Sequence, residues 1–189
     1  MQDQFLRRKK QQFMKDDRSL KQGWDEKILG LCDKLNESND YYTTSSCSGR
    51  ILILIDSKEK RDDLFLKVWH ETISLNDLRG ELDKIKLKKL VYFKQDPCIL
   101  HIACRDLERA QQLIDLAILA GWKRSGIITT KKRFIVELNA TDRIEFPVIN
   151  EGKLLVNDEF LGVVVDEANK KIKESWEKIA RIEKSLLSS

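Results

Sequence analysis

Five consecutive aliphatic residues, Ile51–Ile55, constrain the fold of this chain more than any other feature of its sequence. A short apolar run that is rich in isoleucine predicts a buried strand. The run follows directly on "YYTTSSCSGR", so Thr43–Arg50 is expected to form the loop that enters this strand. A loop anchored on a rigid element is either a simple turn or a working site, and the rest of the chain must distinguish the two.

Helical and strand patterns mix along the chain without a regular βαβ order. Apolar residues at helical spacing predict helices at 1–15, 24–38, 74–85 and 106–120, and from about Asp158 onward. Strands are expected at 89–94, 98–104, 126–130, 133–138 and 144–149; Pro147 favours an edge position for the last, and 64–73 fits either type. We therefore predict a single α+β domain over 1–189. Its mixed or antiparallel sheet is flanked by helices, with a long C-terminal helix and a peripheral basic helix at 1–15.

Composition excludes several classes of protein. The 189 residues include 35 basic and 31 acidic ones, for a net charge of +4, as in an ordinary soluble globular protein. No apolar run is long enough to cross a bilayer, and the positive N-terminus lacks the apolar stretch of a signal peptide. We therefore expect a cytoplasmic protein without membrane contact. Four cysteines without a C-x-x-C pair, and two histidines, favour reduced buried thiols over a metal site.

Basic residues are distributed unevenly. Lys84–Gln95 contains five lysines and Leu116–Val136 contains five basic residues, and neither segment contains an acid. Both segments carry aromatic residues, and Arg7–Lys10 adds a third basic run. Such stretches are typical of a face that binds a polyanion such as RNA, although a solvated lysine-rich surface gives the same pattern.

The hydroxyl-rich segment Thr43–Arg50 is the first candidate site. The chain has no glycine-rich phosphate-binding motif. In this segment the hydroxyl groups can donate hydrogen bonds, Gly49 lets the backbone approach a ligand, and Arg50 offers a fork of donors to phosphate or carboxylate. An ordinary connector is the alternative. Cys47 is a weak candidate nucleophile, because no histidine lies near it in the sequence.

The segment "GWKRSGI" (Gly121–Ile127) is a second candidate site. Trp122 is expected either to stack on a base while Lys123 and Arg124 hold phosphates, or to lie in the core with the two cations solvated. His101 belongs to an alternating strand pattern that can place it on the face opposite its neighbours. A satisfied core histidine is the alternative to a catalytic one.

Three blocks of the chain carry a more specific signal. They are "TTSSCSGRI", "LHIACRDLERAQQLIDLAILAGWKRSGI" and "GKLLVNDEFLGVVVDEANKKIKESWEKIARI". From about Asp17 to Glu183, their order and spacing resemble the tRNA wybutosine-synthesising protein 3 family. The resemblance implies an S-adenosylmethionine-dependent methyltransferase without a Rossmann-type fold. Its substrate would be the N4 ring nitrogen of a 4-demethylwyosine-type guanosine on the 3′ side of the anticodon of phenylalanine tRNA, in wybutosine biosynthesis.

The resemblance also implies roles for individual residues. As the general base it suggests His70, His101 or Asp25. For binding of donor or substrate it suggests Ser45, Ser46, Cys47, Ser48, Gly49, Arg50, Ser125 and Gly126. Lys21 belongs to the family pattern, and with the basic segment Leu116–Val136 it gives the expected RNA contacts: Lys21, Trp122, Lys123, Arg124, Lys131, Lys132 and Arg133. Asp17, Ser19 and Asn169 also match the family pattern, whereas Gln22–Gly23 and Asp96 depart from it.

Two other functions remain open from the sequence. The first is a non-catalytic RNA-binding module that uses the same basic face and does not bind S-adenosylmethionine. The second is a structural subunit whose C-terminal helix docks to a partner. It predicts an exposed apolar stripe along Leu161–Ile182.

Overall fold

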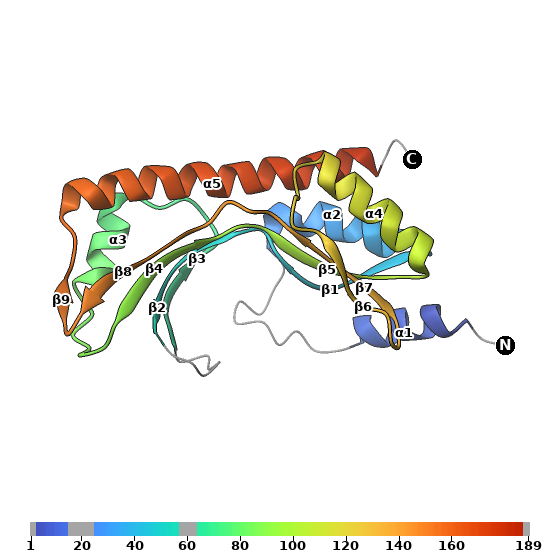
Figure 1. Cartoon of the computed structure of the whole chain (residues 1–189), viewed down its shortest axis with the longest axis horizontal. Helices are drawn as coiled ribbons and strands as arrows, with labels where there is room; N and C mark the ends of the chain where they lie inside the picture. The colour runs from blue at the N-terminus through green and yellow to red at the C-terminus, as the bar shows by residue number, and fades with distance from the viewer. Residues whose placement is uncertain (1–2, 15–24, 57–63, 187–189) are drawn as a thin grey trace. The chain divides into compact units, whose positions relative to one another are not determined.

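The computed structural model describes residues 3–14, 25–56 and 64–186 (Figure 1). The chain divides into two compact units. Unit 1 consists of Met1–Ser48, Cys98–Thr141 and Trp176–Ser189, and unit 2 consists of Gly49–Pro97 and Asp142–Ser175. The predicted α+β class with antiparallel sheets and a long C-terminal helix is confirmed, whereas one domain over 1–189 stays a prediction. Among the described residues no helix is long and apolar enough to span a membrane.

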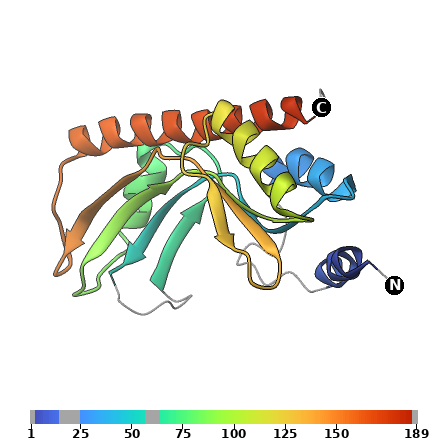
Figure 2. The ribbon, with the colours of Figure 1, turned by 45° about the vertical axis from the view of Figure 1, so that its right-hand side comes forward.

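Unit 1 is built on a four-stranded antiparallel sheet in the order β1-β5-β7-β6. Its strands are β1 (Tyr41–Cys47), β5 (Ile99–Cys104), β7 (Phe134–Asn139) and β6 (Gly126–Thr129). Helices α2 (Glu26–Glu37) and α4 (Leu107–Leu119) cover one face, and α1 (Gln4–Phe13) lies against the other face (Figures 1 and 2). The ring of Phe5 in α1 packs on Tyr42 of β1, with centroids 5.2 Å apart.

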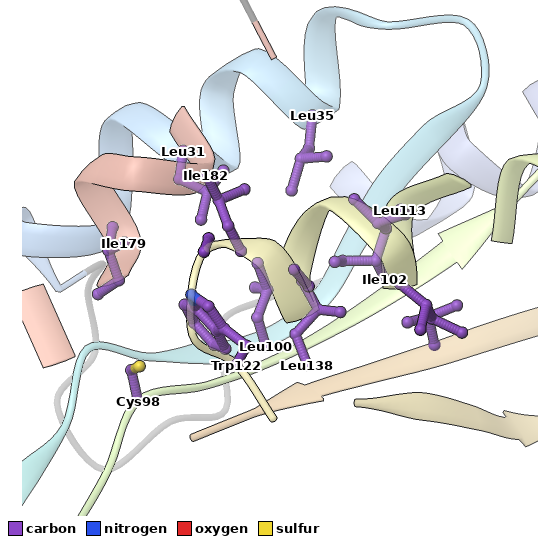
Figure 3. Packing of buried hydrophobic residues seen from close by; sticks show 14 of the residues in the cluster. Leu31, Leu35, Cys98, Leu100, Ile102, Leu113, Trp122, Leu138, Ile179 and Ile182 are labelled. Carbon is purple, nitrogen blue, oxygen red and sulfur yellow. The ribbon is translucent and has the colours of Figure 1, made fainter. Parts of the chain in front are cut away.

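The core of unit 1 lies on the face covered by α2 and α4. Alternate residues of the strands point into it, because successive side chains of a strand face opposite sides. Figure 3 shows how they pack, with the residues Leu31, Leu35, Leu100, Ile102, Leu113, Trp122, Leu138, Ile179 and Ile182. Trp122 is fully buried, and its Nε1 donates to the carbonyl of Lys178 at 3.1 Å.

Unit 2 contains a five-stranded antiparallel sheet in the order β3-β2-β4-β8-β9. Its strands are β3 (Phe65–Trp69), β2 (Arg50–Ile55), β4 (Val91–Asp96), β8 (Ile144–Asn150) and β9 (Lys153–Leu154). Helix α3 (Leu75–Leu82) and the first part of α5 (Asp158–Ser185) complete the unit. Phe160 of α5 packs edge-on against Phe146 of β8. Asn169 of α5 exchanges two hydrogen bonds with the backbone of Ile73, and these fix the segment before α3.

Several local sequence signals correctly predicted where elements begin and end. Asp106 caps α4 by accepting from the amide of Arg109, and Gly121 ends that helix with a φ of +97°. Residues 64–73, which fitted either type, contain strand β3. The predicted edge position of 144–149 is wrong, because β8 lies between β4 and β9. Pro147 is tolerated because β9 pairs only with Ile149 and Asn150.

The apolar stripe of the C-terminal helix is not exposed. Leu161, Ala168, Ile172 and Ile182 of α5 are each fully buried. The prediction of an exposed apolar stripe, which a docking subunit would need, is therefore wrong. The chain's own residues already cover this face of the helix.

The hydroxyl-rich run is the main correction to the expected elements. It was predicted to be a loop, but Tyr41–Cys47 forms strand β1, and only Ser48 and Gly49 separate it from β2. Thr43 points toward α2 and hydrogen-bonds Asn36, whereas Ser45 is exposed. Polar residues are compatible with this strand because β1 is the edge of its sheet and one of its faces is partly open.

Candidate active site on the four-stranded sheet

A β-bulge in β1 determines which side chain faces His101. Thr43 pairs with Ile102, but the next pair is Ser45 with His101, so Thr44 is the extra residue. The Thr44 hydroxyl donates to the carbonyl of His101 at 3.2 Å. Bulges of this kind re-aim side chains and are frequent next to active sites. Here the bulge places Ser45 on the same face as His101.

Four residues then form one row across all four strands of unit 1. Ser45 of β1 pairs with His101 of β5, His101 pairs with Glu137 of β7, and Glu137 pairs with Gly126 of β6. Residues directly opposite each other in a ladder share a face. This face is the one that α2 and α4 do not cover, because the core residues Leu100 and Leu138 alternate with His101 and Glu137.

The side chains of this row are connected by hydrogen bonds. The Ser45 hydroxyl lies 2.8 Å from Nδ1 of His101, and Nε2 of His101 lies 2.7 Å from Oε2 of Glu137. His101 and Glu137 are about one-third exposed, at 30% and 31%. A carboxylate without a proton can only accept, so the contact between Glu137 and Nε2 favours the ring tautomer in which Nδ1 accepts from Ser45. The prediction that His101 faces away from its neighbours in the strand is confirmed.

Gly126 leaves open space at the end of the row. A Cβ atom built on Gly126 would meet no other atom within 4 Å, so this end of the row is accessible to a ligand. The neighbouring Ser125 hydroxyl donates to the carbonyl of Trp122 at 2.7 Å. Ser125 therefore holds the turn that leads into β6.

Asp25 and Ser48 form a buried pair in unit 1. Oδ2 of Asp25 accepts from the amide of Ser48 at 3.0 Å and from its hydroxyl at 2.9 Å. Asp25 is 7% exposed and Ser48 is fully buried. Although Asp25 stands at the N-cap of α2, its side chain makes no capping bond there. The contacts of the Asp25 carboxylate favour an anchoring role over that of a base.

Arg50 and Gly49 lie in unit 2, and both contact residues of that unit. Nε and Nη2 of Arg50 each donate to Oδ2 of Asp96 at 3.2 Å, across the β2–β4 pair. Lys94 and Arg143 also approach Asp96, at 3.6 and 3.4 Å, so three cations surround this carboxylate. Gly49 has a φ of +106°, and a Cβ there would lie 3.4 Å from Ile172.

The remaining candidates belong to both units. His70 is half-buried and follows β3 in unit 2. Ser46 lies on the core face of β1 and hydrogen-bonds Cys32, whose pKa is raised to about 12 by burial. Cys47 is half-buried at the end of β1 and forms no disulfide. Lys21, together with the family positions Asp17 and Ser19, lies outside the described residues.

The expected stacking of Trp122 on a base is not supported, because its ring is fully buried in the core. Lys123 and Arg124 beside it are exposed. A second exposed group, Lys131–Arg133, forms the turn between β6 and β7. Arg8 of α1 donates to the carbonyl of Lys132, so the basic face of the N-terminal helix meets this turn within unit 1.

Comparison with known proteins decides the family. The profile described as Methyltransferase TYW3 matches residues 3–188. This chain belongs to that family. A relative from Archaeoglobus fulgidus, named tRNA(Phe) 7-((3-amino-3-carboxypropyl)-4-demethylwyosine(37)-N(4))-methyltransferase, is 35% identical over all of this chain and 94% of its own length. A protein of the same name from Methanocaldococcus jannaschii is 36% identical over 94% of each chain.

A solved structure agrees with the match. The PH1069 protein from Pyrococcus horikoshii superposes with a TM-score of 0.88 at 32% identity, and the match covers 97% of this chain and 94% of that one. The protein is therefore a methyltransferase of the TYW3 family, as the three sequence blocks predicted, and it uses a methyl donor.

Glu137 is the member of the row that neither the sequence patterns nor the resemblance singled out. The signal was present in "RFIVEL", where one acid interrupts an apolar strand at the alternating position. That Glu137 contacts His101 could be found only from the strand register, which places the two residues opposite each other although they lie 36 residues apart.

Proposed function

We propose that this protein transfers a methyl group from S-adenosylmethionine to the N4 nitrogen of a 4-demethylwyosine-type guanosine in phenylalanine tRNA. We propose further that the accepted base carries the 3-amino-3-carboxypropyl group, which is printed in the names of the relatives that match over nearly the full chain. The observation that carries the proposal to this site is the hydrogen-bonded row Ser45–His101–Glu137 beside the open position of Gly126.

The open face of unit 1 fits a cationic methyl donor. Glu137 offers a partly exposed carboxylate, which complements a positive charge, and Ser45 offers an exposed hydroxyl. The space above Gly126 lets a ligand approach the backbone of β6. When bound, S-adenosylmethionine supplies an electrophilic methyl group on a sulfonium. We assign its binding to the row and the adjoining Gly126.

His101 is the proposed base for the ring nitrogen. A nitrogen that loses a proton on methylation needs an acceptor that is unprotonated near neutral pH, and imidazole suits this task. Nδ1 of His101 accepts from Ser45, whose hydroxyl is exposed on the same face. Asp25 is proposed as an anchor for Ser48 rather than as a base, since Oδ2 of its carboxylate accepts from both the amide and the hydroxyl of Ser48.

The cations Arg50, Lys94 and Arg143 in unit 2 are proposed to bind an anionic group of the substrate. They face Asp96, and Glu145 contacts Lys94 at 3.3 Å, so three cations oppose two carboxylates. The surplus positive charge and the fork of Arg50 suit a phosphate or a carboxylate.

The basic surface of unit 1 is proposed to bind the tRNA backbone. It combines Arg7–Lys10 of α1 with Lys131–Arg133, joined where Arg8 meets Lys132. Replacing Lys131 and Lys132 by alanine should weaken tRNA binding. It should also reduce the slope of log K against log salt by about 1–2, because each lost phosphate contact contributes about 0.7–0.9. Filter binding at several salt concentrations measures this slope. Alanine at Lys170 and Lys173 of α5 is the matched control, and an equal change there would refute the assignment.

Methyl transfer tests the central proposal. The assay measures label passing from S-adenosylmethionine to phenylalanine tRNA that carries the unmethylated tricyclic base. His101→Ala should lower kcat by about 10²- to 10⁴-fold, which is the range of general-base catalysis, whereas His70→Ala tests the other candidate base. Wild-type turnover in His101→Ala would move the base elsewhere. No transfer by the wild type, with tRNA binding retained, would favour the RNA-binding module instead.

A further inference from the structure

We propose that Glu137 is a positioning residue that holds His101 with its hydrogen on Nε2, so that Nδ1 takes up the substrate proton through Ser45. The reaction in this inference rests on the proposed function. The hydrogen-bond arrangement does not, since it concerns the protein's own residues.

The arrangement follows from three strands and two contacts. The β1–β5 and β5–β7 registers place Ser45, His101 and Glu137 side by side, with contacts of 2.8 and 2.7 Å at the two ring nitrogens. The carboxylate can only accept, so it selects the tautomer with hydrogen on Nε2. It also stabilises the imidazolium that forms once Nδ1 is protonated.

The surroundings of His101 leave this role to Glu137. The titratable groups that β1 and β7 turn toward this face are Tyr42 and Cys47 on one side and Glu137 on the other. Gly126 of β6 brings no charge. Helix α1 packs on Tyr42 through the ring of Phe5, and its partly buried cations Arg8 and Lys9 donate to the carbonyls of Lys132 and Ser38. Among the described residues of these elements, Glu137 is the one whose carboxylate pairs with His101.

The proton balance of the step is complete. The ring nitrogen forms a bond to the methyl carbon while the bond between that carbon and the sulfur breaks. The electron pair of the broken bond stays on the sulfur, which becomes a neutral thioether. The proton of the ring nitrogen passes to the Ser45 oxygen as the Ser45 hydroxyl proton passes to Nδ1 of His101. The result is an imidazolium paired with the Glu137 carboxylate, and solvent later removes the proton.

Kinetics separate a positioning role from a purely structural one. Glu137→Gln should lower kcat by about tenfold to a hundredfold, which is part of the full contribution of a general base. Glu177→Gln, an exposed change of the same kind on α5 in unit 1, should leave kcat within about twofold. In a His101→Ala background and at saturating S-adenosylmethionine, Glu137→Gln should cause no further loss of kcat, because its effect on kcat acts through His101. An equal loss in both backgrounds would overturn the proposal.

The pH profile provides a second kinetic test. Removing the carboxylate removes the charge that favours the protonated ring, so the acidic limb of the kcat/KM profile should move to lower pH in Glu137→Gln. Ser45→Ala should lower kcat because the relay is interrupted. A limb that stays in place in Glu137→Gln while kcat falls would indicate a structural effect alone.

Nitrogen NMR tests the arrangement independently of activity. The chain has only two histidines, so His70→Ala leaves a single imidazole to observe. We expect a protonated Nε2 and an unprotonated Nδ1 in the neutral ring, with this preference lost in Glu137→Gln and kept in Glu177→Gln. A neutral ring with hydrogen on Nδ1 would overturn the inference even if methyl transfer were observed. If no transfer were observed, the tautomer would still decide it.

Discussion

The buried pair of Asp25 and Ser48 gives the sharpest test of how the site is assembled. One carboxylate oxygen receives both donors of Ser48, at 3.0 and 2.9 Å, and neither residue has appreciable contact with solvent. If Asp25 anchors the end of β1, its loss should affect stability first. If Asp25 is the base, its loss should affect turnover first.

The expected loss in the free energy of unfolding follows from these two hydrogen bonds. A hydrogen bond to a charged group contributes about 1.5–3 kcal/mol, and a buried donor left without a partner costs about 1–3 kcal/mol. Asp25→Ala should therefore lower the free energy of unfolding by about 3–5 kcal/mol, out of a typical total of about 5–15 kcal/mol. Ser48→Ala removes one of the two donors and should cost about 1–2 kcal/mol.

Denaturant unfolding and amide exchange measure these effects. Asp25→Ala should also remove the protection of the Ser48 amide against hydrogen exchange. Asp33→Ala, on an exposed position of the same helix, should change the free energy of unfolding by less than about 0.5 kcal/mol. Asp25→Asn keeps one accepting oxygen, so its kcat should stay within about tenfold of the wild type. A loss of a hundredfold or more in kcat, with stability unchanged, would refute the anchoring role and restore Asp25 as a base.

Two further predictions concern the glycines and the buried thiols. Gly49→Ala should destabilise the protein by about 1–3 kcal/mol in thermal or denaturant unfolding, because its φ of +106° suits only glycine and its neighbours are close. Gly126→Ala should change the free energy of unfolding by less than about 0.5 kcal/mol and weaken donor binding in calorimetry. A stable Gly49→Ala variant together with a destabilised Gly126→Ala variant that binds the donor normally would contradict the roles given to both glycines. Burial raises the pKa values of Cys32 and Cys104 to about 12, so the native thiols keep protons that the unfolded chain loses above pH 9.0. The free energy of unfolding should thus fall above that pH, by about 1.4 kcal/mol per pH unit for each thiol, and Cys32→Ala/Cys104→Ala should flatten this slope.

Local chemistry made much of the fold predictable from the sequence. The cap at Asp106, the helix end at Gly121 and the strand at Ile51–Ile55 each depend on a few adjacent residues, and the structure has all three. The family was also predictable, because three blocks kept their order and spacing. The exception among the elements was the hydroxyl-rich run, where composition predicted a loop and pairing of β1 with β5 made a strand.

The sequence by itself determined that His101 lies on the face opposite its apolar neighbours, since alternation along a strand is a local property. Only the tertiary structure decided which side chains meet it there. Ser45 and Glu137 lie 56 and 36 residues away, and their positions depend on strand order, register and one bulge at Thr44. Packing of the whole sheet sets these three properties, because a shift of one residue in register would turn each side chain to the other face.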